Sequence, residues 1–146
     1  MNNQTRLEVI LNEAYLLAAA LAFVRICLGI LFFFQAYDKV YVAGMKEFTK
    51  NVTSGTKRSG IPVIFVKLSA YLSSYIELIG GVLLILGVFV SWAYLLLAIN
   101  LIMVVLGFSF LQPLWDMKHV FPRMAMLAFL MVTPLDYDIF RLSALF

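Results

Sequence analysis

The sequence predicts an all-α integral membrane protein, a compact bundle of four transmembrane helices with one long basic loop between the first and the second. Its 146 residues are 64% hydrophobic and only 13% charged, and the mean hydropathy is +0.98. A soluble domain is usually about half apolar and a quarter charged, so a soluble fold of this length could not bury so much apolar surface. Four apolar stretches separated by polar residues give the number of helices. We expect one membrane domain over residues 1–146.

The four expected spans differ in length. The first two, residues 14–37 and 68–90, are long enough to cross a bilayer as helices. The third covers residues 92–111, and only Ser91 and its neighbours separate it from the second. Such a short connection predicts a tight antiparallel hairpin. The apolar stretch of the fourth span, residues 121–135, is short for a bilayer. The span is therefore expected to begin earlier and to cover residues 118–135.

The long loop of residues 38–67 holds most of the basic residues. Its first part, residues 40–50, has the pattern of a short amphipathic helix at the membrane interface. Eight Lys and Arg residues lie on the loop side of the membrane, against Arg6 and Arg141 on the terminal side. The positive-inside rule therefore favours a cytoplasmic loop and two external termini. The expected acidic partner of the lysines is the anionic lipid surface, and no nucleic-acid partner is expected.

Two charged residues, Arg25 and Glu77, lie inside the first two spans. A charge at such depth costs from a few to more than ten kcal/mol unless it faces a partner or a polar cavity. At about 1.5 Å per residue, Arg25 lies roughly 18 Å and Glu77 roughly 14 Å from the loop side. Gly29, Gly80 and Gly81 lie on the same helix faces and allow close contact. We therefore expect an Arg25–Glu77 ion pair, either as a structural lock on helix register or as part of a polar pocket for a lipid-soluble ligand or for protons.

Five further polar residues on the helices are candidates for a supporting role: Lys39, Gln35, Asn100, His119 and Arg123. Asn100 is expected to form a hydrogen bond between helices. His119 and Arg123 share one face at the start of the fourth span, and His119 is interpreted first as an interfacial hydrogen-bonding residue and second as a proton-handling group. One histidine with scattered carboxylates is too few ligands for a zinc or iron site, so no metal is expected. The single cysteine excludes an intrachain disulfide and a CxxC redox pair.

Two segments resemble the DoxX family. The first, FVRICLGILFFFQAYDK, has the family's arginine, Leu-Gly pair, aromatic-rich turn and lysine. The second, YIELIGGVLLILGVFV, has its glutamate, double glycine and later glycine. The terminal TPLDYD resembles the Ser-Leu-Asp ending of many members, with Pro134 where Ser is usual. The resemblance covers about residues 20–138.

The resemblance implies a four-helix protein of the bacterial inner membrane, with Arg25, Lys39 and Glu77 as the central polar positions. Many members have a His-Gly pair before the lysine, where this chain has Gln35-Ala36. If that histidine handles protons in relatives, this chain lacks the step.

The family includes a subunit of thiosulfate:quinone oxidoreductase and a member of a mycobacterial membrane oxidoreductase complex. The resemblance therefore implies a quinone-binding or membrane-anchoring component of an oxidoreductase. No redox centre is evident in the chain, so the cofactor would be carried by a partner, and no residue is assigned a catalytic role. The alternative is a non-catalytic accessory or scaffold subunit that binds a membrane protein partner or further copies of itself. A small transporter is less favoured because so short a chain lacks an inverted repeat.

Overall fold

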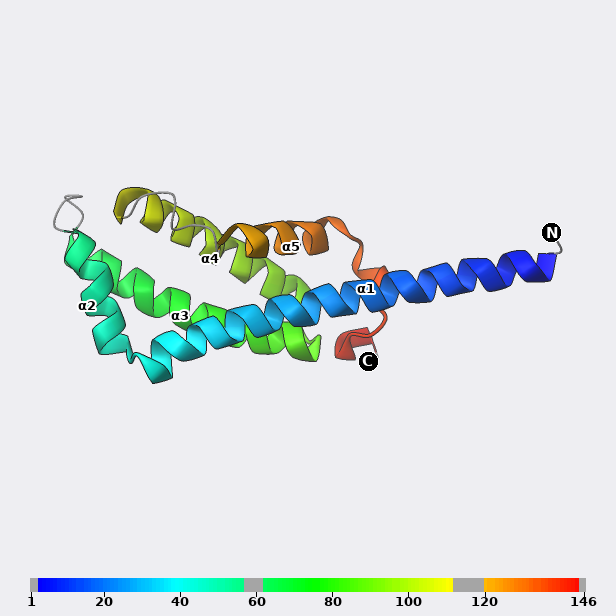
Figure 1. The fold of residues 1–146 in the computed structure, drawn as a ribbon, viewed down its shortest axis with the longest axis horizontal. Coiled ribbons are helices and arrows are strands. Elements are labelled where there is room, and N and C mark those ends of the chain that lie inside the picture. The colour runs from blue at the N-terminus through cyan, green and yellow to red at the C-terminus, as the bar shows by residue number, and fades with distance from the viewer. Residues whose placement is uncertain (1–2, 57–61, 112–119, 145–146) are drawn as a thin grey trace.

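The computed structural model describes residues 3–56, 62–111 and 120–144, and in these ranges the chain is helical (Figure 1). The helices α1, α3, α4 and α5 pack side by side, with both termini toward the same end of the molecule and the short helix α2 at the other end. His119, at the start of the expected fourth span, lies outside the described residues.

Helix α1 (Asn3–Tyr37) is the longest element, and it continues into a π-helix, η1 (Asp38–Val42). Its sequence is rich in Leu and Ala, which are strong helix formers. Its 35 residues correspond to about 52 Å at 1.5 Å per residue. The N-terminal part projects beyond the other helices (Figure 1), a feature that the sequence did not predict.

The basic loop contains an amphipathic helix, α2 (Met45–Thr56), which begins five residues later and ends six residues later than the expected range of 40–50. Gly44 precedes it with φ +77°, a left-handed conformation that glycine adopts without strain. Thr49 is buried, and its hydroxyl donates a hydrogen bond of 2.7 Å to the carbonyl of Met45. Lys46 and Lys50 are exposed. The helix packs against α3 with one face and exposes its basic face.

Helices α3 (Val63–Leu86) and α4 (Val90–Leu111) form the expected antiparallel hairpin. Pro62 precedes α3, where a missing N–H and a fixed φ suit a helix start. Gly87 ends α3 in the left-handed conformation, and its N–H donates to carbonyls of the last turn. The turn between the helices is therefore only three residues long.

The fourth apolar helix, α5 (Val120–Val132), is shorter than the expected span of residues 118–135. Its 13 residues cover about 20 Å, less than the roughly 30 Å of a hydrocarbon core. Pro134 stops the helix, and two short 3-10 turns follow, η3 (Leu135–Tyr137) and η4 (Leu142–Ala144). Within the described residues, three helices are thus long and apolar enough to cross a membrane, and α5 is a shorter apolar helix.

The contact between α1 and α3 is closest where two glycines face each other. A Cβ added to Gly29 would lie 2.8 Å from the carbonyl oxygen of Gly81, and one added to Gly81 would lie 2.8 Å from the carbonyl oxygen of Gly29. Both neighbours are backbone atoms and cannot rotate away. This contact fixes the register of the two antiparallel helices, because it admits no side chain on either side.

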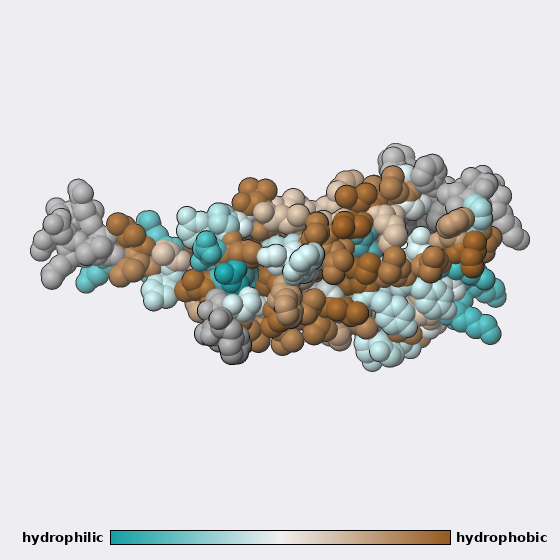
Figure 2. Space-filling model, turned by 180° about the vertical axis from the view of Figure 1, so that it is seen from behind, coloured by the Kyte–Doolittle hydropathy of each residue, from teal (hydrophilic) through white to brown (hydrophobic). Residues whose placement is uncertain are grey.

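Large apolar side chains cover much of the outer surface. Among them Phe23 is 67% exposed on α1, Ile79 58% on α3 and Ile102 62% on α4. Brown, hydrophobic side chains predominate over the central part of the molecule in Figure 2. Contact of such a surface with lipid costs no free energy, whereas exposing it to water is unfavourable. The protein is an integral membrane protein.

Candidate functional site

The polar residues of the interior form two separate clusters. The Arg25 cluster consists of Arg25, Asp138 and two backbone carbonyls, and it lies where α3 ends. The Glu77 cluster consists of Glu77, Lys39 and Asn100, and it lies closer to the basic loop. Both join elements that are far apart in the sequence.

In the Arg25 cluster, one guanidinium meets the C-terminal segment and α3 at once. Arg25 Nε donates to Asp138 Oδ2 at 2.7 Å, and both side chains are at most 5% exposed. Nη1 donates to the carbonyl of Leu84, and Nη2 donates to the carbonyl of Phe140 at 3.2 Å. A buried charge is tolerated when it is paired and its donors are satisfied, and this arrangement meets both conditions for Arg25.

Gly87 makes room for this cluster. A Cβ there would lie 2.8 Å from Arg141 Cα and 2.9 Å from Arg25 Nη1. Its carbonyl accepts a hydrogen bond of 3.1 Å from the backbone N–H of Ser143. The C-terminal segment that carries Asp138 therefore packs directly against the turn between α3 and α4.

In the Glu77 cluster, one carboxylate joins three elements. Glu77 on α3 is 1% exposed. Its Oε2 accepts a bond of 2.6 Å from Lys39 Nζ on η1, and its Oε1 accepts one of 3.3 Å from Asn100 Nδ2 on α4. Lys39 Nζ also lies 5.6 Å from the ring centroid of Phe48 on α2, a cation–π distance.

Two more of the candidate residues lie on neighbouring elements. Arg123 on α5 is buried, its guanidinium lies 5.4 Å from the ring centroid of Phe32, and it interacts electrostatically with Glu77. Gln35 is half-buried on α1. The structure thus brings Lys39, Asn100 and Arg123 to Glu77 and leaves Arg25 elsewhere.

The ion pair expected between Arg25 and Glu77 is not formed, because each has another partner. The glycine contact sets the register: Arg25 lies four residues before Gly29, whereas Glu77 lies four residues before Gly81 on the antiparallel helix. The two charges are therefore about eight residues, or about 12 Å, apart along the helix axes. The depth estimate from the span ends gave an offset of only roughly 4 Å.

Sequence reasoning missed Asp138 as the partner of Arg25. The signal was present as an acidic residue in TPLDYD, directly after the last apolar helix. Asp138 is 4% exposed, which is unusual for an aspartate in a terminal segment. Nothing in its spacing shows that the chain turns back under α1 after Pro134.

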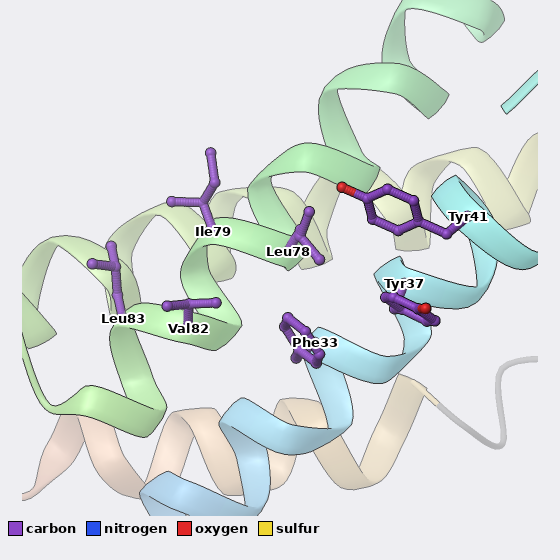
Figure 3. A pocket seen from close by; sticks show the side chains of 7 residues that line it. All are labelled: Phe33, Tyr37, Tyr41, Leu78, Ile79, Val82 and Leu83. Carbon is purple, nitrogen blue, oxygen red and sulfur yellow. The ribbon is translucent and has the colours of Figure 1, made fainter. Parts of the chain in front are cut away.

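The hollow between α1 and α3 is an apolar groove of about 420 Å³, not the expected polar pocket (Figure 3). One side, which we name the aromatic wall, is formed by Phe33, Tyr37 and Tyr41. The facing side, the aliphatic wall, is formed by Leu78, Ile79, Val82 and Leu83. The lining contains no charged side chain. The charges of both clusters lie in the interior, and the groove opens on the outer surface.

The three rings of the aromatic wall follow one another along α1 and η1. The rings of Phe33 and Tyr37 are 6.1 Å apart at 25°, and those of Tyr37 and Tyr41 are 5.0 Å apart at 35°. Both tyrosines are well exposed, at 41% and 64%. Tyr41 lies on the π-helix η1, beyond Tyr37, and its hydroxyl points toward α3, whereas the hydroxyl of Tyr37 points away from the aliphatic wall (Figure 3).

The described residues contain no group of three or more His, Cys, Asp or Glu side chains that could hold a metal ion. Cys27 is a free thiol, half-buried on α1. The seven residues that line the groove present an apolar, partly aromatic surface, and the ion pairs of the two clusters hold the helices behind it.

Replacing Asn100 by Leu is expected to lower the free energy of unfolding by about 1–3 kcal/mol, measured by denaturant titration in mixed micelles, because the buried Glu77 Oε1 loses this hydrogen bond. The substitution removes the hydrogen bond to Glu77, which is worth about 1 kcal/mol between helices in a membrane. It also removes Asn100 Oδ1, which is buried and has no hydrogen-bond partner among the described residues, and this offsets part of the loss. A loss above this range would show that the amide supports more than this one bond.

The comparisons with known proteins give one match, to a family model. The DoxX family model matches residues 20–111, more than half of the chain. The match includes Arg25, Lys39, Glu77 and the two glycines of the helix contact, and ends before Asp138. No match was found among curated proteins or among solved structures. The chain belongs to the DoxX family.

Proposed function

We propose that this protein is the non-catalytic, quinone-binding component of a membrane oxidoreductase, and that the quinone lies in the groove between α1 and α3. The observation that carries the proposal is the groove itself, an apolar hollow with an aromatic wall on one side and the hydroxyl of Tyr41 directed toward α3. The groove has a volume of about 420 Å³ and is open to the outer surface, so a ligand could enter it from the lipid.

The lining favours a neutral ligand with a flat ring and an apolar tail. A ring can stack on the aromatic wall, while the tail follows the aliphatic wall into the lipid. The hydroxyl of Tyr41 can donate to a carbonyl oxygen of a quinone. A charged headgroup would find no counter-charge among the seven lining residues.

The source of electrons lies in another subunit. The chain has one cysteine and one histidine, so its own side chains do not supply an evident redox centre. In this proposal the partner carries the redox cofactor, and this protein holds the quinone at a fixed place in the membrane.

Filling the groove is expected to weaken quinone binding at least tenfold. Val82→Trp places an indole between the two walls, and a tenfold loss corresponds to about 1.4 kcal/mol. The measurement is equilibrium dialysis of decylubiquinone against purified protein in lipid nanodiscs. Tyr41→Phe should weaken binding by a smaller factor, because a neutral hydrogen bond contributes about 0.5–1.5 kcal/mol.

The matched control is Leu95→Trp, which adds the same side chain at a 46% exposed position on α4 that does not line the groove. Its affinity should equal that of the unsubstituted protein. The proposal fails if the unsubstituted protein does not bind decylubiquinone where a known quinone enzyme does, or if Val82→Trp and Leu95→Trp bind equally.

A second candidate function is that of a scaffold subunit. The observation that favours it is that Arg25 pairs with Asp138 and Lys39 with Glu77. These pairs lock helices and leave no charge exposed in the groove. Extraction in mild detergent should then recover a stable stoichiometric complex, whereas a lone monodisperse protein would contradict a scaffold role.

A further inference from the structure

An ion pair links the elements that form the two walls of the groove. The π-helix η1 carries Tyr41, the last ring of the aromatic wall, and Lys39, two residues earlier. Lys39 Nζ donates to Glu77 Oε2 at 2.6 Å. Glu77 directly precedes Leu78, the first residue of the aliphatic wall. The pair therefore ties the element that carries Tyr41 to the helix on the other side of the groove.

Packing does little to fix η1. None of its five residues is buried, and its backbone lies mainly against its neighbours in the chain, α1 and α2. The N–H of Ala43 donates to the carbonyl of Asp38 at 2.8 Å and closes a wide turn of the kind that occurs mostly as a one-turn bulge. Gly44 follows, and no described atom lies within 4 Å of a Cβ added there. The turn is therefore open on that side.

The ion pair is placed to fix the rotation of η1. Glu77 is 1% exposed, and its other carboxylate oxygen accepts a hydrogen bond from Asn100, so it is an anchor inside the bundle. The Lys39 side chain reaches inward to this anchor, whereas Tyr41 is 64% exposed. Two residues span about half a helical turn. Holding Lys39 inward therefore turns Tyr41 outward, to the groove.

We propose that Lys39 is a positioning residue for the ligand of the groove: its ion pair with Glu77 fixes the rotation of η1 and so holds the hydroxyl of Tyr41 toward α3 (Figure 3). Lys39 does not line the groove and acts through Tyr41. The inference rests on the proposed function, because it concerns the hydrogen bond from Tyr41 to a carbonyl oxygen of the ligand. A hydroxyl that is in place before binding loses less entropy when the ligand arrives.

The two buried ion pairs thus have different tasks. The pair of Arg25 and Asp138 holds the C-terminal segment, and none of the seven lining residues belongs to that segment. Loss of one partner from either pair leaves a buried charge and destabilises the fold. Only the loss of Lys39 should also change the ligand affinity of the folded protein. Asp138→Asn is therefore the matched control for Lys39→Met.

The first test is a double-mutant cycle, measured by equilibrium dialysis of decylubiquinone against folded protein in lipid nanodiscs. Lys39→Met and Tyr41→Phe should each weaken binding about fivefold, the equivalent of one neutral hydrogen bond of about 1 kcal/mol. The double variant should bind about as weakly as either single variant, because a misplaced hydroxyl and a missing one contribute equally little.

Two variants should keep the affinity of the unsubstituted protein. Lys39→Arg retains a charged donor for Glu77, and Asp138→Asn leaves the pair of Lys39 and Glu77 intact. If Lys39→Met does not fold, Lys39→Met combined with Glu77→Gln removes both charges, leaves no unpaired charge from this pair, and carries the same prediction.

The second test measures the order of η1 without a ligand, from the mobility of a spin label at Val42→Cys in a Cys27→Ala background. Val42 is 70% exposed on η1 and does not line the groove. Lys39→Met should add a mobile component to the spectrum of the label. Lys39→Arg and Asp138→Asn should leave the spectrum unchanged.

The outcomes separate this inference from the proposed function. Additive effects of Lys39→Met and Tyr41→Phe, or unchanged label mobility in Lys39→Met, would overturn the inference while the quinone site stands. An equal loss of affinity in Asp138→Asn would assign the effect to general destabilisation and also overturn it. If the unsubstituted protein does not bind decylubiquinone, the proposed function fails, and the spin label still decides whether Lys39 fixes η1.

Discussion

Replacing Asp138 by Asn is expected to lower the free energy of unfolding by about 3–5 kcal/mol, the cost of leaving one member of a buried ion pair without its partner. Arg25 is 1% exposed and cannot reach water when the carboxylate is lost. The measurement is equilibrium unfolding in mixed micelles of a mild detergent and SDS, followed by circular dichroism.

Asp136→Asn is the matched control, since it makes the same change two residues away in the same segment. The Asp136 carboxylate is almost fully exposed and lies 3.9 Å from Arg141, and exposed pairs contribute about 0–1 kcal/mol. Equal costs for the two substitutions would contradict the assigned role of Asp138.

The double variant Arg25→Met, Asp138→Leu should recover most of the lost stability, because a buried ion pair can often be replaced by apolar residues at little cost. The carbonyl of Leu84 keeps a second donor, the N–H of Gly87 at 3.3 Å. A double variant as unstable as Asp138→Asn would show that Arg25 does more than neutralise Asp138.

Gly81→Ala and Gly29→Ala should each lower the free energy of unfolding by about 1–3 kcal/mol, the usual cost of forcing extra methyl groups into a packed interface. The added Cβ would meet backbone atoms of the facing helix at 2.8 Å. Since backbone cannot move as a side chain does, α1 and α3 must separate, and the contacts around them loosen together.

Gly107→Ala is the control for these two changes. Gly107 also lies in an apolar helix, α4, but no atom lies within 4 Å of a Cβ added there. Alanine at an open helical position stabilises by up to about 1 kcal/mol relative to glycine. If Gly107→Ala destabilised as much as Gly81→Ala, the effect would come from helix propensity or lipid contact and not from the α1–α3 contact.

Apolar composition and the lengths of the apolar stretches were enough to predict a helical membrane protein, its first three spans and its hairpin. These features are local: a residue run that is too apolar for water and long enough for a bilayer has to form a helix in lipid. The C-terminal end of the fourth helix was overestimated by three residues, because Pro134 and the 3-10 turn after it end α5 at Val132; residues 118 and 119 lie outside the described ranges. The apolar content of this helix alone does not show where the chain leaves it.

The same limit applies to the candidate site. Arg25, Glu77, Asn100 and Arg123 stood out because polar residues are costly in an apolar span, and Lys39 because it continues the helix face of Arg25 and matches the family resemblance. The structure places all five in the interior or at its edge. The apolar groove did not stand out, since Phe33, Tyr37 and the aliphatic residues of α3 are ordinary in a membrane helix. A hollow depends on which side chains fail to fill a space, and spacing along one helix does not contain that information.

The sequence thus determined where the helices form and how unfavourable each buried charge is. Both depend on the free energy of transferring single residues or short runs from water to lipid. Only the tertiary structure decided which charges meet. The backbone contact of Gly29 with Gly81 sets the register, and that register places Arg25 and Glu77 about 12 Å apart along the axes. The returning C-terminal segment then supplies Asp138 to one charge, and η1 supplies Lys39 to the other.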